Sequence, residues 1–238
     1  MFQEGSSATG RGFEATSRHG WWFRRWASAR VFAGVTDRHV EVARLIEHVQ
    51  FPVVTVGAEQ VHGRSIAAIG HPRLGAMVIA GCDALLTSVP GVGLLIRTAD
   101  CLPLFIADPL RGVVGLAHAG WRGLAHALPI HLLSALYRLY RTRAGDVHVA
   151  IGPAIRACCY DVGPEFLKRF ESHVRRRGAT YHCDLVGAAT AQLVRSGVRP
   201  DRILDSGQCT ACTPASWCSL RREGQAAGRL TSLIVLRP

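Results

Sequence analysis

One cysteine and two histidines, Cys101, His62 and His118, have the residue types and positions expected of a site that performs chemistry. A thiolate and two imidazoles suit a borderline-soft divalent ion such as Zn²⁺. Three protein ligands leave the fourth tetrahedral position open, as in catalytic zinc sites, where the metal lowers the pKa of bound water to about 7. Copper would bind the same ligands strongly, so the ligand types leave the choice between zinc and copper open.

The spacing of these residues matches no local zinc motif, and two other interpretations stand beside the metal site. In one, the histidines are satisfied side chains at strand ends and Cys101 is a buried free thiol. In the other, Cys101 is a nucleophile with His118 or His62 as its base, which would make a thiol hydrolase. Both functional interpretations require the surrounding elements to bring the three side chains together.

Strand-like segments adjoin each of the three residues. The apolar run Leu102–Ala107 directly follows Cys101, and the run Gly112–Ala117 directly precedes His118. Both runs have the length and β-branched character of buried strands. His62 follows another β-rich segment. Because side chains converge where neighbouring strands end, we expect the three residues to meet around one metal ion.

The rest of the pattern predicts strands and helices within one domain. Asp37 is a plausible N-cap for the first helix, and Pro129 implies that the longest helical stretch starts near it or bends. We expect an α+β fold with mixed sheets over residues 30–238, and a flexible segment over residues 1–29 whose tryptophans pack onto the domain. Further strands are expected at 30–35, 51–56, 77–80, 92–97, 147–151, 203–204 and 230–236, and helices at 37–49, 124–140, 164–176 and 184–196.

The composition is that of a soluble globular domain with a basic balance. Hydrophobic residues make up 48% of the chain and charged residues 19%, and no apolar run reaches the roughly 18 residues of a membrane span. The net charge of +11 comes almost entirely from arginine, without any nucleic-acid motif. We therefore expect anionic small molecules such as phosphate as partners, with no specific nucleic acid and no membrane; the oligomeric state stays open.

The eight cysteines, without a secretory signal, indicate a reducing, cytoplasmic location. Cys209 and Cys212 form an isolated C-x-x-C. Without a second pair, this motif is weak evidence for zinc or for redox chemistry. We interpret these two residues, like Cys82 and Cys218, as buried structural thiols.

Sequence blocks around the candidate site carry a family resemblance. The resemblance begins near residue 30 and continues in order to about residue 236. The chain resembles the laccase-domain, or multicopper polyphenol oxidase, family, now regarded as purine nucleoside phosphorylases. The matching blocks are Gln60-Val61-His62-Gly63, Thr98-Ala99-Asp100-Cys101-Leu102-Pro103, Ala117-His118-Ala119-Gly120-Trp121-Arg122-Gly123, Ile151-Gly152-Pro153, Cys159-Tyr160-Asp161-Val162-Gly163, Cys209-Thr210, Ser219-Leu220-Arg221-Arg222 and Gly228-Arg229.

The resemblance implies a compact α/β/β/α layered domain with a mononuclear zinc held by His62, Cys101 and His118, which are also the catalytic candidates. It implies phosphorolysis of adenosine, inosine, guanosine and methylthioadenosine to base and ribose 1-phosphate, with adenosine deamination as a second activity. Purine nucleosides and phosphate are then its partners. The older family label implies copper-dependent oxidation of phenols. Some members are linked to correction of cell-wall precursors, which would suit a Cys-dependent hydrolase.

Three further residues are candidates for supporting roles. Arg122, four residues after His118, could make a bidentate contact to phosphate or form an ion pair at the strand–helix turn. Asp100 could orient a ligand histidine or make a turn contact. Gln60 could bind the substrate or cap its own loop.

The first strand departs from the family pattern. The family normally has Thr/Ser-x-Arg, a Gly-Gly stretch and an Asn-containing loop before the first helix. Here Val35-Thr36-Asp37-Arg38 runs almost directly into the helix at His39. Loss of this loop predicts a less complete substrate pocket. A non-catalytic module that binds a metal or a nucleoside is therefore an alternative to an enzyme.

Overall fold

The strands at the centre of the protein direct alternate side chains into two apolar layers. In β9 (Leu102–Asp108), Leu104 and Ile106 pack with helical residues such as Leu132, whereas Phe105 packs into the layer between the two sheets. Alternation follows from the two-residue period of a strand. A strand buried on both faces reads as a continuous apolar run, which is why this segment could be recognised in the sequence.

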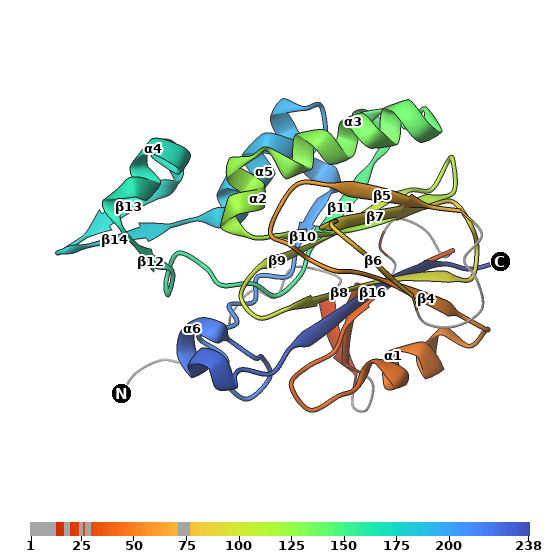
Figure 1. The fold of residues 1–238 in the computed structure, drawn as a ribbon, viewed down its shortest axis with the longest axis horizontal. Helices are drawn as coiled ribbons and strands as arrows, with labels where there is room; N and C mark the ends of the chain where they lie inside the picture. The colour runs from red at the N-terminus through yellow and green to blue at the C-terminus, as the bar shows by residue number, and fades with distance from the viewer. Residues whose placement is uncertain (1–12, 17–19, 24–25, 27–29, 71–76) are drawn as a thin grey trace.

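The computed structural model describes residues 13–16, 20–23, 26, 30–70 and 77–238 (Figure 1). In these ranges the strands form two large mixed sheets. The seven-stranded sheet has the order β1 (Phe13–Thr16), β2 (Gly20–Phe23), β3 (Val31–Val35), β16 (Leu230–Leu236), β8 (Val92–Thr98), β4 (Val54–Ala58), β6 (Met77–Ile79). The six-stranded sheet has the order β15 (Ile203–Asp205), β11 (His148–Ile151), β9, β10 (Val113–Ala119), β7 (Ala84–Thr87), β5 (Ile66–Ile69).

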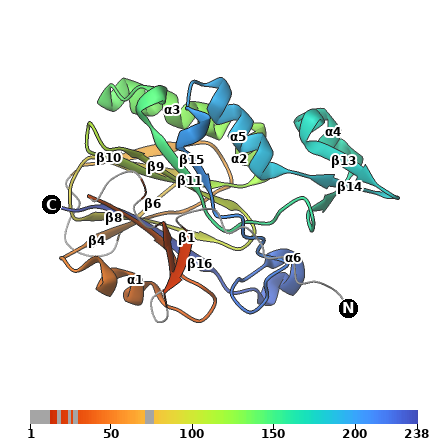
Figure 2. The same cartoon turned by 180° about the vertical axis from the view of Figure 1, so that it is seen from behind.

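Helices cover the outer faces of both sheets, and the two sheets pack against each other (Figures 1 and 2). Helices α2 (Trp121–Ala125), α3 (Leu128–Tyr140) and α5 (Leu185–Arg195) lie over the six-stranded sheet. Helix α1 (Val42–Val49) packs on the other side, where its Leu45 and Val49 contact β3 and β16. The expected α+β fold with α/β/β/α layers is confirmed.

A smaller unit projects from one end of the layers (Figure 2). It consists of the sheet β12 (Asp161–Val162), β14 (Thr180–Cys183), β13 (Val174–Arg177) and the short helix α4 (Leu167–Phe170). The helix predicted over residues 164–176 is therefore wrong in its second half, where β13 lies. Helix α6 (Leu220–Glu223) lies near the same end of the molecule.

Two strands before residue 30, β1 and β2, extend the seven-stranded sheet. The tryptophan prediction is confirmed. Trp21 lies 5.2 Å from Trp217 between ring centroids, and Trp26 is buried. The remaining residues of the 1–29 segment lie outside the described part of the chain.

The structure tests two predictions about where helices begin. Asp37 is not the N-cap of α1, which begins at Val42; its carboxylate instead accepts a hydrogen bond from the backbone N–H of His39 at 2.7 Å. The break near Pro129 is confirmed, since α2 and α3 are separate helices and Pro129 lies in the first turn of α3. Among the described helices, none is long and apolar enough to cross a membrane.

Candidate active site

The three predicted metal ligands meet in space. His62, Cys101 and His118 each offer a donor atom, and the three atoms lie within 4.8 Å of one another. The two imidazole rings are nearly perpendicular, with centroids 4.7 Å apart. His118 is buried, Cys101 is partly buried and His62 is exposed, so the group opens toward solvent on the His62 side.

Strand pairing positions two of these side chains. Cys101 immediately precedes β9, and His118 is the penultimate residue of β10. The two strands are antiparallel neighbours, with Leu102 opposite Ala119. The start of one strand and the end of the other therefore lie at the same edge of the sheet, as the sequence predicted.

Asp83 joins the third ligand to the other two. His62 lies in the loop between β4 and β5 with a left-handed backbone (φ 60°). The Asp83 carboxylate accepts hydrogen bonds from the backbone N–H groups of His62 (2.8 Å) and Gly63 (2.7 Å). It also lies 2.9 Å from Nδ1 of His118. One buried carboxylate thus holds both histidines.

The role expected of Asp100 is performed by Asp83 instead. The hydrogen bonds of the Asp100 side chain run from Thr210 Oγ1 (2.6 Å) and from the backbone N–H of Arg221 (2.7 Å), and neither histidine is its partner. Asp83 was not selected from the sequence. The available signal was an acidic residue directly before a buried apolar segment, here β7, which pairs with the strand of His118.

Electrostatics favour a charged Cys101–His118 pair. Burial acts to raise the pKa of Cys101, but hydrogen bonds and positive charge from His118 and His62 lower it to about 7. Burial acts to lower the pKa of His118, but Asp83 and Cys101 raise it to about 9. The thiolate needed for metal binding is therefore well populated at neutral pH, and a metal ion would displace the proton from His118.

The space between the donor atoms fits a single ion. A Cβ added at Gly120 would lie 3.1 Å from Cys101 Sγ and 3.3 Å from His62 Cδ2. Glycine at this position keeps the space beside the ligands clear. Two imidazoles and a thiolate are also a donor set that zinc and copper accept. The residues present therefore fit a mononuclear transition-metal site.

A cavity of about 740 Å³ opens onto these donors. Its lining includes Gln60, Arg97, Thr98 and Arg229, as well as all three candidate ligands. Arg97 and Arg229 are exposed, whereas Thr98 is 2% exposed. Thr98 Oγ1 has no hydrogen-bond partner within the described residues.

The structure places the two other predicted residues differently. Arg122 lies outside the cavity lining, and its guanidinium stacks over Trp121 at 5.0 Å. Gln60 lines the cavity, but its side-chain amide is paired with the backbone of Arg97, donating to the carbonyl at 2.6 Å and accepting from the N–H at 2.7 Å. Of the basic residues at the cavity, Arg97 was not selected from the sequence, whereas Arg229 lies in one of the blocks that carry the family resemblance.

The short segment before α1 still reaches the edge of this site. Residues 37–41 line a second cavity of about 720 Å³, and Gln60, Arg97 and Arg229 line both cavities. The segment is held in place by Arg38, whose backbone N–H donates to Ser216 O at 2.9 Å. Despite the missing loop, the chain therefore provides a wall on this side.

Comparisons with known proteins identify relatives of this chain. The family model described as "Multi-copper polyphenol oxidoreductase laccase" matches residues 15–237. "Purine nucleoside phosphorylase YlmD" of Geobacillus stearothermophilus is 34% identical over 229 residues, covering 88% of this chain and 84% of that protein. "Adenosine deaminase RL5" from an unidentified prokaryote is 35% identical over 160 residues, covering 63% of this chain and 61% of that protein.

A solved structure extends the similarity to the fold. The crystal structure of YlmD from Geobacillus stearothermophilus superposes with a TM-score of 0.85 at 30% identity, covering 95% of this chain and 99% of that one. Sequence and fold match over nearly the whole length. The chain therefore belongs to the multi-copper polyphenol oxidoreductase laccase family.

Proposed function

We propose that this chain is a metal-dependent purine nucleoside phosphorylase, which transfers the ribosyl group of a purine nucleoside to phosphate. The observation that carries the proposal is one cavity faced by a His–Cys–His donor set and by two exposed arginines. The similarity to a relative named purine nucleoside phosphorylase, over most of both chains, supports the same activity.

His62, Cys101 and His118 would hold a zinc ion, which when bound supplies a Lewis acid with one open coordination position. Asp83 fixes the orientation of His118 and the backbone of His62. A carboxylate behind a ligand histidine raises its basicity and sets its tautomer.

Phosphorolysis forms a bond between a phosphate oxygen and C1′ while the N-glycosidic bond breaks and its electron pair leaves with the purine. Arg97 and Arg229 would bind the phosphate, because guanidinium groups match its oxygens in charge and geometry. The departing purine takes up a proton from solvent, toward which the donor group opens on the His62 side.

Adenosine deamination is a second candidate activity of the same site. The relative named adenosine deaminase RL5 favours it. In this reaction water replaces the amino group at C6 and ammonia leaves, so no phosphate is consumed. The two activities therefore differ in whether phosphate is required.

The test is to incubate zinc-loaded protein with adenosine or inosine, with and without phosphate. Free base and ribose 1-phosphate formed only with phosphate would support phosphorolysis, and inosine formed from adenosine without phosphate would support deamination. The His118→Ala variant should lose both. Absence of free base would contradict the phosphorylase proposal. Phenol oxidation that requires added copper and is lost in Cys101→Ala would favour the copper alternative instead.

A further inference from the structure

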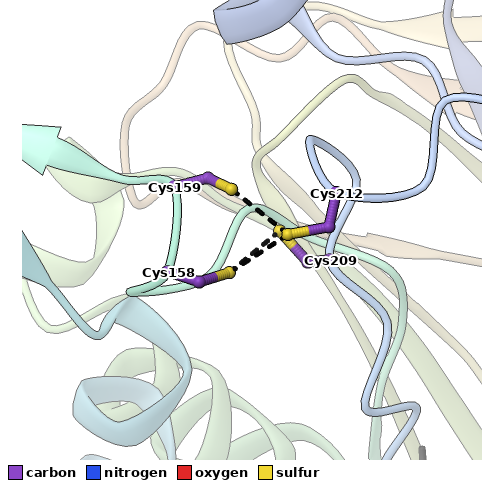
Figure 3. A group of neighbouring side chains, drawn as sticks. All are labelled: Cys158, Cys159, Cys209 and Cys212. Atoms are coloured by element: carbon purple, nitrogen blue, oxygen red, sulfur yellow. Dashed lines mark hydrogen bonds between the residues drawn. The ribbon is translucent and has the colours of Figure 1, made fainter. Parts of the chain in front are cut away.

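Four cysteines outside the candidate active site converge on one point. Cys158 and Cys159 lie in the turn after β11, and Cys209 and Cys212 lie in the loop after β15. Their sulfur atoms all lie within 4.8 Å of one another. Figure 3 shows the first pair pointing across at the second. The isolated C-x-x-C of the sequence thus gains a second pair from a distant segment.

Three distances between these sulfurs are close to, though shorter than, those in a tetrahedral thiolate site. Cys158 Sγ lies 3.5 Å from Cys209 Sγ and 3.4 Å from Cys212 Sγ, and Cys159 Sγ lies 3.2 Å from Cys212 Sγ. Zinc–sulfur bonds of about 2.3 Å at tetrahedral angles place thiolates about 3.8 Å apart. We propose that Cys158, Cys159, Cys209 and Cys212 form a second metal site, which holds a structural Zn²⁺ through four thiolates.

The four cysteines of this cluster are not a set of inert thiols buried in the apolar core. Cys158 and Cys212 are exposed and Cys159 is partly exposed, whereas Cys82, Cys183 and Cys218 are buried among apolar residues. The interpretation of Cys209 and Cys212 as buried structural thiols is therefore wrong for Cys212. Partly exposed thiols gathered at one point are also accessible to an incoming metal ion.

The surroundings of Cys209 suit a metal thiolate. The backbone N–H groups of Cys212 and Arg156 and the thiol of Cys158 donate hydrogen bonds to its sulfur. Arg156 also places positive charge near the cluster while it pairs with Asp205. Donors and positive charge of this kind offset the negative charge of four thiolates.

The two segments are held together without the metal, so the site is preformed. Ala154 and Cys209 form an isolated parallel bridge, and Thr210 N–H donates to the Ala154 carbonyl at 3.1 Å. Arg156 Nε donates to the Gln208 carbonyl at 3.2 Å. A metal ion bound here would meet ligands already in position, which reduces the ordering that binding requires.

The site is closed, in contrast to the site at His62, Cys101 and His118. Four protein ligands complete a tetrahedron and leave no position for water or substrate, so the role is structural. The loop that it fixes carries Thr210, whose hydroxyl donates to Asp100 at 2.6 Å beside Cys101. The second metal would therefore stabilise one edge of the candidate active site without taking part in its chemistry.

The test measures metal content in protein that lacks the first site. The Cys101→Ala/His118→Ala variant, purified under reducing conditions, should retain about one zinc ion per chain by elemental analysis. Adding Cys158→Ser and Cys212→Ser should remove it. Cys218→Ser, a buried cysteine outside both groups, is the matched control and should retain the metal.

Two measurements keep the proposal testable if the Ser variants fold poorly. Cobalt added to zinc-depleted Cys101→Ala/His118→Ala protein should give the intense visible bands of tetrahedral all-thiolate Co²⁺, with an unchanged circular dichroism spectrum. Thiol counting in denaturant should find the four cysteines reduced. A metal-free variant, bound iron instead of zinc, an octahedral cobalt spectrum, or a disulfide among the four cysteines would each overturn the proposal.

Discussion

The Asp83 carboxylate lies 2.9 Å from Nδ1 of His118, and this contact leaves Nε2 for Cys101 and the space between the ligands. Because the same carboxylate accepts the backbone N–H of His62 at 2.8 Å, one side chain fixes two candidate ligands. Asp83 is fully buried, so its orientation is set by these partners rather than by solvent. The first prediction follows from this arrangement.

Replacing Asp83 by Asn should weaken zinc binding about 10- to 100-fold, the usual effect of removing a partner behind a ligand histidine. The amide can still accept hydrogen bonds, but it neither carries the charge nor enforces the tautomer of His118. Zinc affinity measured by competition with a chelator checks this. Asp108→Asn is the control, because Asp108 is equally buried and binds Thr142 and Arg111 instead. Equal losses in both variants would show a general effect of a buried amide.

Gly120→Ala tests the space beside the ligands. The backbone at Gly120 (φ −76°) suits alanine, so any effect comes from the Cβ, which would lie 3.1 Å from Cys101 Sγ. Overpacking of this kind costs about 1–3 kcal/mol, which corresponds to a roughly 5- to 150-fold fall in zinc affinity. Gly70→Ala is the control, since none of the described residues would lie within 4 Å of a Cβ there. Unchanged zinc binding in Gly120→Ala would argue against an ion at this point.

The arginines at the cavity should determine the KM for phosphate. Arg97→Ala and Arg229→Ala each remove a guanidinium from the lining. A hydrogen bond to a charged group contributes about 1.5–3 kcal/mol, so we expect the KM for phosphate to rise about tenfold or more in steady-state kinetics. Arg122→Ala, which lies outside the lining and stacks on Trp121, should leave that KM unchanged. The reverse result would restore the phosphate role that the sequence suggested for Arg122.

Cys101 should be unusually reactive in metal-free protein. Its pKa of about 7 lies below that of an ordinary thiol, so the thiolate fraction, and with it the alkylation rate, should rise with a midpoint near pH 7. His118→Ala should move this midpoint upward, since the hydrogen bond and charge of His118 help to lower it. Peptide mapping after iodoacetamide treatment follows Cys101 separately. Cys183, whose pKa burial raises to about 12, is the unreactive internal reference.

Zinc loading should abolish this reactivity, because a coordinated thiolate is no longer free to attack iodoacetamide. Persistent alkylation of Cys101 in the presence of excess zinc would instead favour a free nucleophile, and with it the thiol-hydrolase alternative.

Much of the central fold could be predicted from the sequence because its strands are buried on both faces. The run before His118 and the run after Cys101 are continuous and apolar, and the structure places β9 and β10 there. Helix α5 was also predictable, since Asp184 caps it through Gly187 N–H at 2.9 Å. A continuous apolar run and a side-chain cap are local features, and local features can be recognised in a single sequence.

The small sheet β12–β14–β13 was not predicted, because the feature that specifies it is a turn and not a pattern of apolar residues. Strand β13 contains Val174 and three exposed arginines, so it shows no apolar alternation. It forms because Gly178, with φ 59°, allows a two-residue turn that pairs Arg177 with Thr180. The sequence 164–176 instead suggested a continuous helix, because Pro164 is a good first helical residue.

The candidate site likewise has residues that could be predicted from the sequence and residues that could not. His62, Cys101 and His118 were selected by residue type and position at strand ends, and the resemblance favoured a metal site because their spacing carries no local motif. Asp83 and Arg97 approach them only through strand pairing and loop closure, and the second cysteine pair joins Cys209 from a distant turn. Contacts between such distant segments are decided by topology, which single-sequence patterns do not specify.

Strand β2 covers the backbone of β3 on the side away from β16, with Trp21 opposite Val35. A chain cut at residue 30 would leave the N–H and C=O groups of β3 exposed along a buried, apolar strand. Such an edge is a template for pairing with another chain, so the shortened protein would be prone to self-association. Strand β2, with its two tryptophans, therefore protects β3 from such pairing as well as contributing to the core.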